Sequence, residues 1–177
     1  MSTETALVLL DTQVNMFEES TAAYDAERLL RRLQVLLLHA RQMGLDIIYV
    51  RHNGDEGNPD EPGTPGWEIH PNLAPENGEL VLQKSSPDAF ADTNLDYELR
   101  SRNITRIVLA GLQSELCIHA TLRRAVDLGY DVVLARDGHS TFDVEDLSAP
   151  ELVELVNEEL SSFANVVSIS ELYFLDA

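Results

Sequence analysis

Three residues of this chain have the chemical types needed for covalent catalysis: Asp11, Lys84 and Cys117. Cys117 is the single cysteine, and Lys84 is the single lysine beside eleven arginines. A thiol attacks a carbonyl carbon only as the thiolate, and a helix N-terminus or a nearby cation lowers its pKa. An aspartate whose pKa is raised toward neutrality could take the thiol proton and later activate water. The three residue types therefore favour nucleophilic hydrolysis.

The elements that must position these residues alternate along the chain. Short apolar runs typical of buried strands occupy residues 6–10, 45–50, 79–83, 104–111, 130–135 and 165–170. Helical patterns occupy residues 25–44, 93–103, 115–129 and 148–163. Strands that alternate with helices predict right-handed crossovers and a mostly parallel sheet covered on both faces. We therefore expect a single three-layer α/β/α domain over residues 1–177.

Polar residues stand where the predicted strands end, which is where parallel sheets bind ligands. Those at or just beyond successive strand ends are Asp11, His52, Lys84, Cys117, Asp137 and His139. A helix that begins near Ser114 would hold Cys117 in its first turn, beside free N–H groups and the positive end of the dipole. A lone cysteine is more often a small buried hydrophobe, and an Asp or Lys at a strand end is often a cap or a solvated charge. The coincidence of all three types at strands expected to be neighbours favours the catalytic interpretation.

Composition limits the partners of the protein. The chain has 31 acidic and 12 basic residues and a formal charge of −19, which repels nucleic acids and anionic membranes. We expect neither as a partner. One cysteine cannot form an internal disulfide, and the first apolar run is too short for a signal segment, so a cytoplasmic location is expected. The acidic, lysine-poor composition fits salt adaptation and codon usage equally well.

One long irregular segment, residues 52–78, is rich in Gly, Pro, Asn and acidic residues. Loops of this length within a compact domain are usually functional lids or disordered. Trp67, the only tryptophan, favours a packed loop.

Four ordered motifs carry a resemblance to a known family. They are LLDTQVNMF, GTPGWEIHPNL, QKSSPDAFADTNLDYELRSRNI and VLAGLQSELCIHATLRRAVDLGYDVVLARDGHSTFD, and the resemblance that they carry covers nearly the whole chain. The chain resembles the isochorismatase-like cysteine hydrolases, which include nicotinamidases and N-carbamoylsarcosine amidohydrolases. The resemblance implies a six-stranded, Rossmann-like parallel sheet and an Asp–Lys–Cys triad of Asp11, Lys84 and Cys117.

The resemblance also implies the surroundings of the nucleophile. A non-proline cis peptide would fall at Leu112–Gln113 and aim the N–H groups of Gln113 and Cys117 at the oxyanion. Gln13 matches the family's Asp-x-Gln pattern and either supports the site or caps the strand end. Family members usually form dimers or larger homo-oligomers. The apolar segment 171–177 could pack on a neighbour or on its own sheet.

The chain departs from nicotinamidases after the second strand, where it lacks their Asp-x-His metal motif. We therefore expect no metal and no other cofactor, and nicotinamide is disfavoured as the substrate. His52 is either a pocket residue or a satisfied strand-end histidine, and His70 is expected to be structural. Candidate pocket residues for a small-molecule substrate are Gln13, Met16, Phe17, Trp67 and Phe90.

The expected function is hydrolysis of a C–N bond in a small amide or carbamoyl compound through a Cys117 thioester. One alternative is vinyl-ether hydrolysis of an isochorismate-like substrate by Asp11 and Lys84, with Cys117 as a bystander. Another is a ligand-binding member without turnover.

Overall fold

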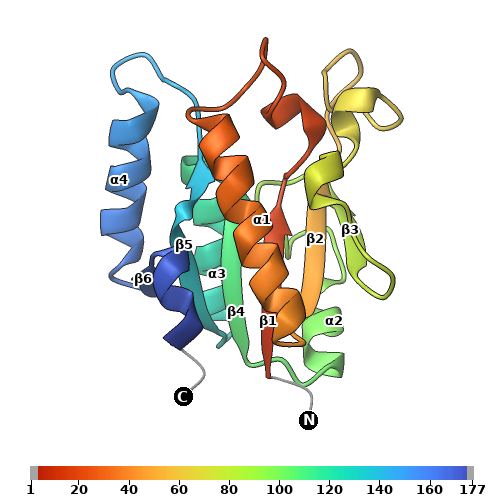
Figure 1. Cartoon of the computed structure of the whole chain (residues 1–177), viewed down its shortest axis with the longest axis vertical. Helices are drawn as coiled ribbons and strands as arrows, with labels where there is room; N and C mark the ends of the chain where they lie inside the picture. The colour runs from red at the N-terminus through yellow and green to blue at the C-terminus, as the bar shows by residue number, and fades with distance from the viewer. Residues whose placement is uncertain (1–3, 175–177) are drawn as a thin grey trace.

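The computed structural model describes residues 4–174 and consists of a parallel sheet between two helical layers (Figure 1). Its six strands lie in the order β3-β2-β1-β4-β5-β6. Their bounds are β1 (Thr5–Leu10), β2 (Asp46–His52), β3 (Leu80–Lys84), β4 (Arg106–Leu112), β5 (Asp131–Ser140) and β6 (Asn165–Val167). Each paired register is parallel, which confirms the predicted α/β sheet.

The helices bury the two faces of the sheet. Their bounds are α1 (Ala26–Gln42), α2 (Leu95–Ser101), α3 (His119–Asp127) and α4 (Ala149–Leu160). Alternate β1 residues point to opposite sides: Leu7 and Leu9 pack with the leucines of α1, whereas Val8 packs with α2, α3 and α4. The three side chains are at most 1% exposed, so β1 is the centre of a three-layer core.

The strand order reverses direction between β1 and β4. In doubly wound sheets this switch point opens a crevice at the carboxyl ends of the strands. Asp11 follows β1, and the turn that contains Cys117 follows β4. Both residues thus lie at the switch point, and the carboxyl ends of the strands form the upper edge of the sheet in Figure 1.

Gly111 lets β4 approach β1 closely at this point. Its φ is +125°, and a Cβ atom there would lie 2.0 Å from the carbonyl oxygen of Leu10. Only glycine avoids both the strain and the clash.

The predicted ends of β5 and β6 are wrong. β5 does not stop at residue 135: it bulges so that Leu109 pairs with Leu134 but Gly111 pairs with His139. Asp137 and His139 therefore lie within β5 rather than after it. β6 ends at Val167 instead of residue 170 because the N–H of Ile169 bonds to Asp137 Oδ1 at 2.8 Å and the chain turns into the 3₁₀ segment η5 (Ile169–Phe174).

The long loop is packed, as Trp67 suggested. Its short 3₁₀ turns are η2 (Pro65–Trp67) and η3 (Pro71–Leu73). The indole Nε1 donates to Asn53 Oδ1 at 2.8 Å, and the Arg51 guanidinium lies 3.4 Å from the centroid of the indole ring. These contacts fasten the loop to the end of β2.

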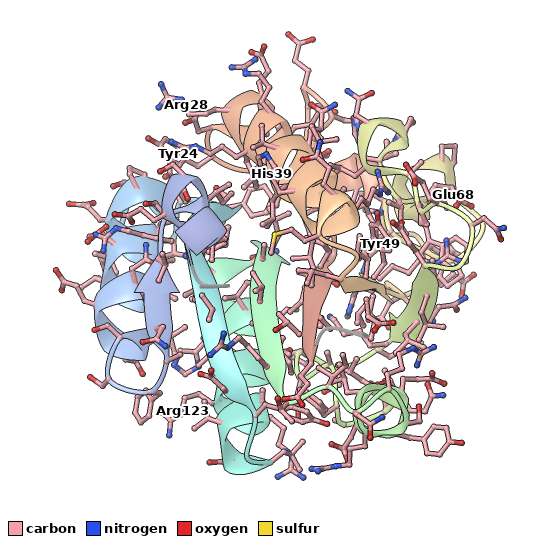
Figure 2. All side chains as sticks on the ribbon, turned by 60° about the horizontal axis from the view of Figure 1, so that its bottom comes forward. Tyr24, Arg28, His39, Tyr49, Glu68 and Arg123 are labelled. Carbon is pink, nitrogen blue, oxygen red and sulfur yellow. The ribbon has the colours of Figure 1, made fainter. Side chains whose placement is uncertain are left out.

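Charged side chains gather on the outside of this fold. Figure 2 shows Arg28, Glu68 and Arg123 at the periphery of the molecule. Of the helices within residues 4–174, none combines the length and hydropathy needed to cross a bilayer. Residues 175–177 of the predicted docking segment lie outside the described chain, while Leu172 packs against the α1 side of the core.

Candidate active site

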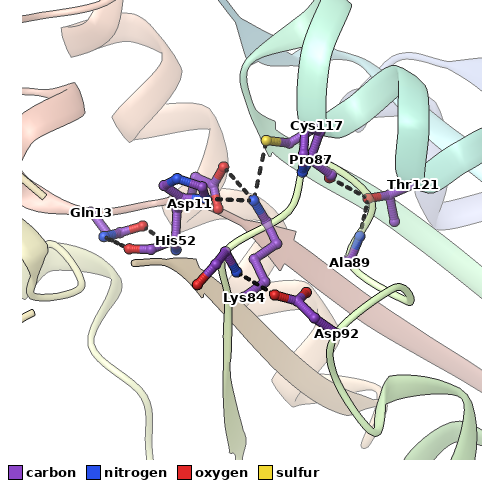
Figure 3. A network of polar contacts seen from close by, with 10 residues as sticks. Asp11, Gln13, His52, Lys84, Pro87, Ala89, Asp92, Cys117 and Thr121 are labelled. Atoms are coloured by element: carbon purple, nitrogen blue, oxygen red, sulfur yellow. Dashed lines mark hydrogen bonds and ion pairs between the residues drawn. The ribbon is translucent and has the colours of Figure 1, made fainter. Parts of the chain in front are cut away.

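The structure brings Asp11, Lys84 and Cys117 together at the switch point. Lys84 Nζ lies 3.2 Å from Asp11 Oδ2 and 3.2 Å from Cys117 Sγ (Figure 3). All three residues are buried: Lys84 is 1% exposed, Asp11 2% and Cys117 8%. One ammonium group therefore bridges the carboxylate and the thiol.

Lys84 reaches this position from a more distant strand than expected. We predicted that the strands bearing the three residues are neighbours, but β2 separates β3 from β1. Because adjacent strands lie about 4.8 Å apart, only a long side chain can reach from β3 to the switch point. The Lys84 side chain does so across the end of β2, where its Nζ meets His52 Nδ1 at 3.3 Å.

The three contacts of Lys84 Nζ match the three N–H donors of a protonated amine. Burial alone would lower the pKa of Lys84, but its interactions with Asp11 and Cys117 outweigh the effect of burial, and the pKa of Lys84 is raised. A charged Lys84 donates to His52 Nδ1, so the proton of a neutral His52 ring lies on Nε2. His52, which the sequence left undecided, thus belongs to the network.

Gln13 holds His52 in place. Its Nε2 donates to the carbonyl oxygen of His52 at 2.9 Å, and its Oε1 accepts from the N–H of His52 at 2.7 Å. Both atoms of the buried amide are thereby used by the backbone at the end of β2. The side chain joins the ends of β1 and β2 and supports the site through His52. Its role in a substrate pocket stays a prediction.

Asp11 has an unusual backbone and one free carboxylate oxygen. Its φ is +52°, in the left-handed region that few residues except Gly, Asn and Asp adopt. Oδ1 is buried and has no hydrogen-bond partner within residues 4–174. Burial raises the pKa of Asp11, although the charge of Lys84 opposes this shift. Oδ1 is therefore an available acceptor whose affinity for a proton exceeds that of a solvated carboxylate.

Cys117 lies in a π-helical turn, η4 (Ser114–Ile118), that precedes α3 and follows a cis peptide bond between Leu112 and Gln113. We predicted that the helix start and Lys84 lower its pKa. This is wrong for the resting site: burial and the negative charge of Asp11 raise the pKa of the Cys117 thiol to about 12, against the opposing effect of Lys84. The resting group is a thiol, and a thiolate forms when its proton leaves for an acceptor.

Alkylation of Cys117 should reveal this raised pKa. Below the pKa the thiolate fraction grows about tenfold per pH unit, and the thiolate is the reactive form. We expect the rate of carboxamidomethylation by iodoacetamide to rise continuously from pH 7 to pH 9.5. Intact-protein mass spectrometry follows the alkylation of a single thiol because the chain has no other cysteine. A rate that is already level between pH 6 and pH 8 would show a resting thiolate instead.

The other predicted pocket residues lie outside this network of described contacts. Met16 is buried in the core beneath α1, and Phe17 meets the His70 ring edge to face at 5.3 Å. Phe90 stacks on Tyr130 at 6.1 Å. The neighbouring Ala89 donates its N–H to Thr121, so Phe90 lies in the loop near the nucleophile segment, and its place in a substrate pocket stays a prediction. Trp67 is engaged by Asn53 and Arg51, as described above.

The loop after Lys84 is fastened by two residues that the sequence analysis missed. Asp92 Oδ2 accepts from the N–H of Ser85 at 2.7 Å. Thr121 Oγ1 accepts from the N–H of Ala89 at 3.0 Å and donates to the carbonyl oxygen of Pro87 (Figure 3). Thr121 lies four residues after Cys117 on the same helical face. A polar threonine on a helix face predicted to be buried is the sequence feature that could have identified it. The loop thus ties Lys84 to the segment that carries Cys117.

Residues 4–174 contain no cluster of three or more His, Cys, Asp or Glu side chains arranged to hold a metal ion. The chemistry that this site offers comes from a buried carboxylate, an ammonium and a thiol.

Comparison with known proteins places these residues in a family context. A family model described as the isochorismatase domain matches residues 5–171. A streptothricin hydrolase of Streptomyces noursei is 37% identical over 159 residues, which cover 90% of this chain and 57% of that protein. The ureidoacrylate amidohydrolase RutB of Stutzerimonas stutzeri is 26% identical over 78% of this chain and 71% of its own length.

Solved structures of the same family resemble this fold. A candidate isochorismatase hydrolase from Oleispira antarctica superposes with a TM-score of 0.90 at 34% identity, over 97% of this chain and 98% of that one. The chain spans little more than half the length of the streptothricin hydrolase that it matches.

Proposed function

Because the chain belongs to the isochorismatase family of hydrolases, we propose that it hydrolyses a C–N bond of a small amide or carbamoyl compound through a thioester at Cys117. The observation that carries this proposal is the position of Lys84 Nζ, 3.2 Å from both Asp11 Oδ2 and Cys117 Sγ. Burial of an ammonium and a carboxylate is costly. Their position beside the thiol is therefore better explained by a catalytic role of Cys117 than by a structural one.

In the first half-reaction, Asp11 Oδ1 takes the thiol proton as Sγ attacks the carbonyl carbon of the substrate. Lys84 remains protonated and stabilises the developing thiolate. The N–H groups of Gln113 and Cys117 stabilise the negative carbonyl oxygen. Asp11 then gives its proton to the leaving nitrogen, the C–N bond breaks, and an acyl thioester remains on Cys117.

Water completes the cycle. Asp11, again ionised, takes a proton from water as the water oxygen attacks the thioester carbon. The C–S bond breaks, the acid leaves, and Asp11 returns its proton to the sulfur. The raised pKa of Asp11 suits both halves because the group must accept and release a proton near neutral pH.

The relatives support hydrolysis of this kind. One is named a streptothricin hydrolase and another a ureidoacrylate amidohydrolase. The chain covers only part of the streptothricin hydrolase. We therefore infer the same class of reaction, hydrolysis of a C–N bond, and do not infer the substrates of these relatives.

A second candidate is vinyl-ether hydrolysis, in which Asp11 acts as the acid and Cys117 takes no part. The raised pKa of the thiol is the observation in its favour, since a protonated thiol is also what a bystander would be.

One experiment separates these candidates. A panel of small amides and carbamoyl compounds is assayed for release of ammonia or amine, and isochorismate for release of pyruvate. Each assay uses untreated enzyme and enzyme alkylated with iodoacetamide at pH 9. We expect turnover of an amide that alkylation abolishes. Isochorismate turnover that survives alkylation would establish the second candidate, and a silent panel beside a reactive thiol would indicate a binding protein.

A further inference from the structure

A second buried polar network lies directly behind the nucleophile turn. Ser114 Oγ is 2.7 Å from His139 Nδ1, and His139 Nε2 is 3.0 Å from Asn157 Oδ1. These residues are 0%, 4% and 2% exposed, respectively. They come from η4, β5 and α4, so the network joins the turn that bears Cys117 to two other elements of the domain.

The bulge in β5 creates this network. Between Leu134 and His139 the strand accommodates extra residues, and pairing resumes with Gly111 opposite His139 and Leu112 opposite Ser140. His139 is thereby placed beside the last residues of β4, immediately before the turn that begins at Ser114. In a strand without the bulge, His139 would lie beyond the end of β4 instead of opposite Gly111.

The hydrogen bonds of Asn157 fix the proton positions. Its Nδ2 donates to the carbonyl oxygen of Arg136 at 3.2 Å, which leaves Oδ1 to face His139. An oxygen accepts, so His139 Nε2 must bear the proton and donate. Nδ1 of the neutral ring then has a lone pair and accepts from the Ser114 hydroxyl. Burial lowers the pKa of His139, which keeps this neutral form dominant.

We propose that His139 is a positioning residue for the nucleophile: by accepting the Ser114 hydroxyl hydrogen bond, it fixes the turn that directs Cys117 Sγ toward Lys84 and Asp11. This inference concerns the same site as the proposed function and rests on it for the kinetic effect. Ser114 is the first residue of the turn and stands three residues before Cys117. Loss of its anchor lets the whole turn rotate, and a misplacement of about 1 Å at a reacting atom can cost roughly 100-fold in rate.

A matched pair of substitutions separates the two contacts of the ring. In His139→Asn, the amide oxygen occupies the place of Nδ1 and can still accept from Ser114, but the contact with Asn157 is lost. In His139→Gln, the amide nitrogen occupies the place of Nε2 and can still donate to Asn157, but the acceptor for Ser114 is lost. Both variants are similar in polarity and burial, so a purely structural role would affect them alike.

We expect His139→Gln and Ser114→Ala to lower kcat by roughly 10- to 100-fold with little change in KM. The rate of alkylation of Cys117 at pH 9 should change in the same variants. His139→Asn should keep most of the wild-type kcat and the wild-type alkylation rate. Circular dichroism and thermal unfolding verify that each variant is folded. Should the histidine variants fail to fold, Ser114→Ala, which removes one hydroxyl, still tests the proposal.

Two outcomes would overturn the inference. One is equal loss of kcat in the Asn and Gln variants in step with their melting temperatures. The other is a folded Ser114→Ala variant with wild-type kcat and alkylation rate. The alkylation assay needs no substrate, so a failure of the amide hydrolysis proposal would be seen separately, as absent turnover in the wild type.

Discussion

Replacement of Cys117 by alanine is expected to lower amide turnover by roughly 10⁴-fold or more, to the background of the assay. The proposed thioester cannot form without Sγ, and the Asp11 and Lys84 side chains alone offer no substitute nucleophile. The loss of one buried sulfur atom should cost only about 1 kcal/mol of folding free energy, so the variant should be folded. Initial rates on the best amide of the panel and a thermal unfolding curve measure the two effects.

Cys117→Ser is the matched control for this prediction. A serine hydroxyl can still contact Lys84 Nζ, but it is a much weaker acid and nucleophile than a thiol at this site. We expect near-native thermal stability together with a rate close to that of the alanine variant. Turnover above a few per cent of wild type in the alanine variant would exclude Cys117 as the nucleophile.

Replacement of Lys84 by methionine is expected to affect both activity and stability. Methionine is similar in length but removes the ammonium that bridges Asp11 and Cys117. The developing thiolate then loses its counter-ion, and we expect kcat/KM to fall by roughly 10²–10³-fold. The fully buried Asp11 carboxylate also loses its partner, which should cost about 3–5 kcal/mol at pH 7. Chemical denaturation beside steady-state kinetics measures both losses.

The stability loss of Lys84→Met should depend on pH in a defined direction. Without Lys84, the pKa of Asp11 in the folded protein rises further above its unfolded value, so folding disfavours the ionised form. The penalty is complete above the folded-state pKa, shrinks as the pH falls and is absent below the unfolded value of ~3.9. The difference in unfolding free energy between variant and wild type should therefore be smaller at pH 4.5 than at pH 7.

A double variant distinguishes pairing from packing. Asp11→Asn/Lys84→Met removes both charges, and Asn tolerates the left-handed backbone at position 11. We expect it to regain part of the stability lost in Lys84→Met but none of the activity. A double variant that is less stable than Lys84→Met would show that the methionine side chain, and not the unpaired carboxylate, caused the loss.

Much of this architecture can be predicted from the sequence because hydrophobic patterning is local. The apolar runs and their order identify a parallel α/β sheet, and Asp11 and Lys84 are visible because each stands at the end of such a run. The strand order is not local. The sequence alone did not reveal that β2 lies between Lys84 and Asp11, and so the contact between Lys84 and His52 was not predicted.

The protonation state of Cys117 shows a second limit. A helix start and a cation predict a lowered pKa, but the outcome depends on burial and on the distance to Asp11, which only the folded structure supplies. The partner of Ser114 was missed for a similar reason. The sequence predicts His139 just beyond a strand end, and only the bulge in β5 extends the strand to this residue and places it behind the nucleophile.

The most direct test of the thioester mechanism is a search for the covalent intermediate on Cys117. Wild-type enzyme is mixed with the best amide substrate, quenched in acid during steady-state turnover and measured by intact-protein and peptide mass spectrometry. The thioester mechanism predicts a mass increase equal to the acyl part of the substrate, confined to the peptide that contains Cys117 and absent from Cys117→Ala. Sustained turnover with no adduct at any quench time, and with full activity after complete alkylation of Cys117, would contradict it.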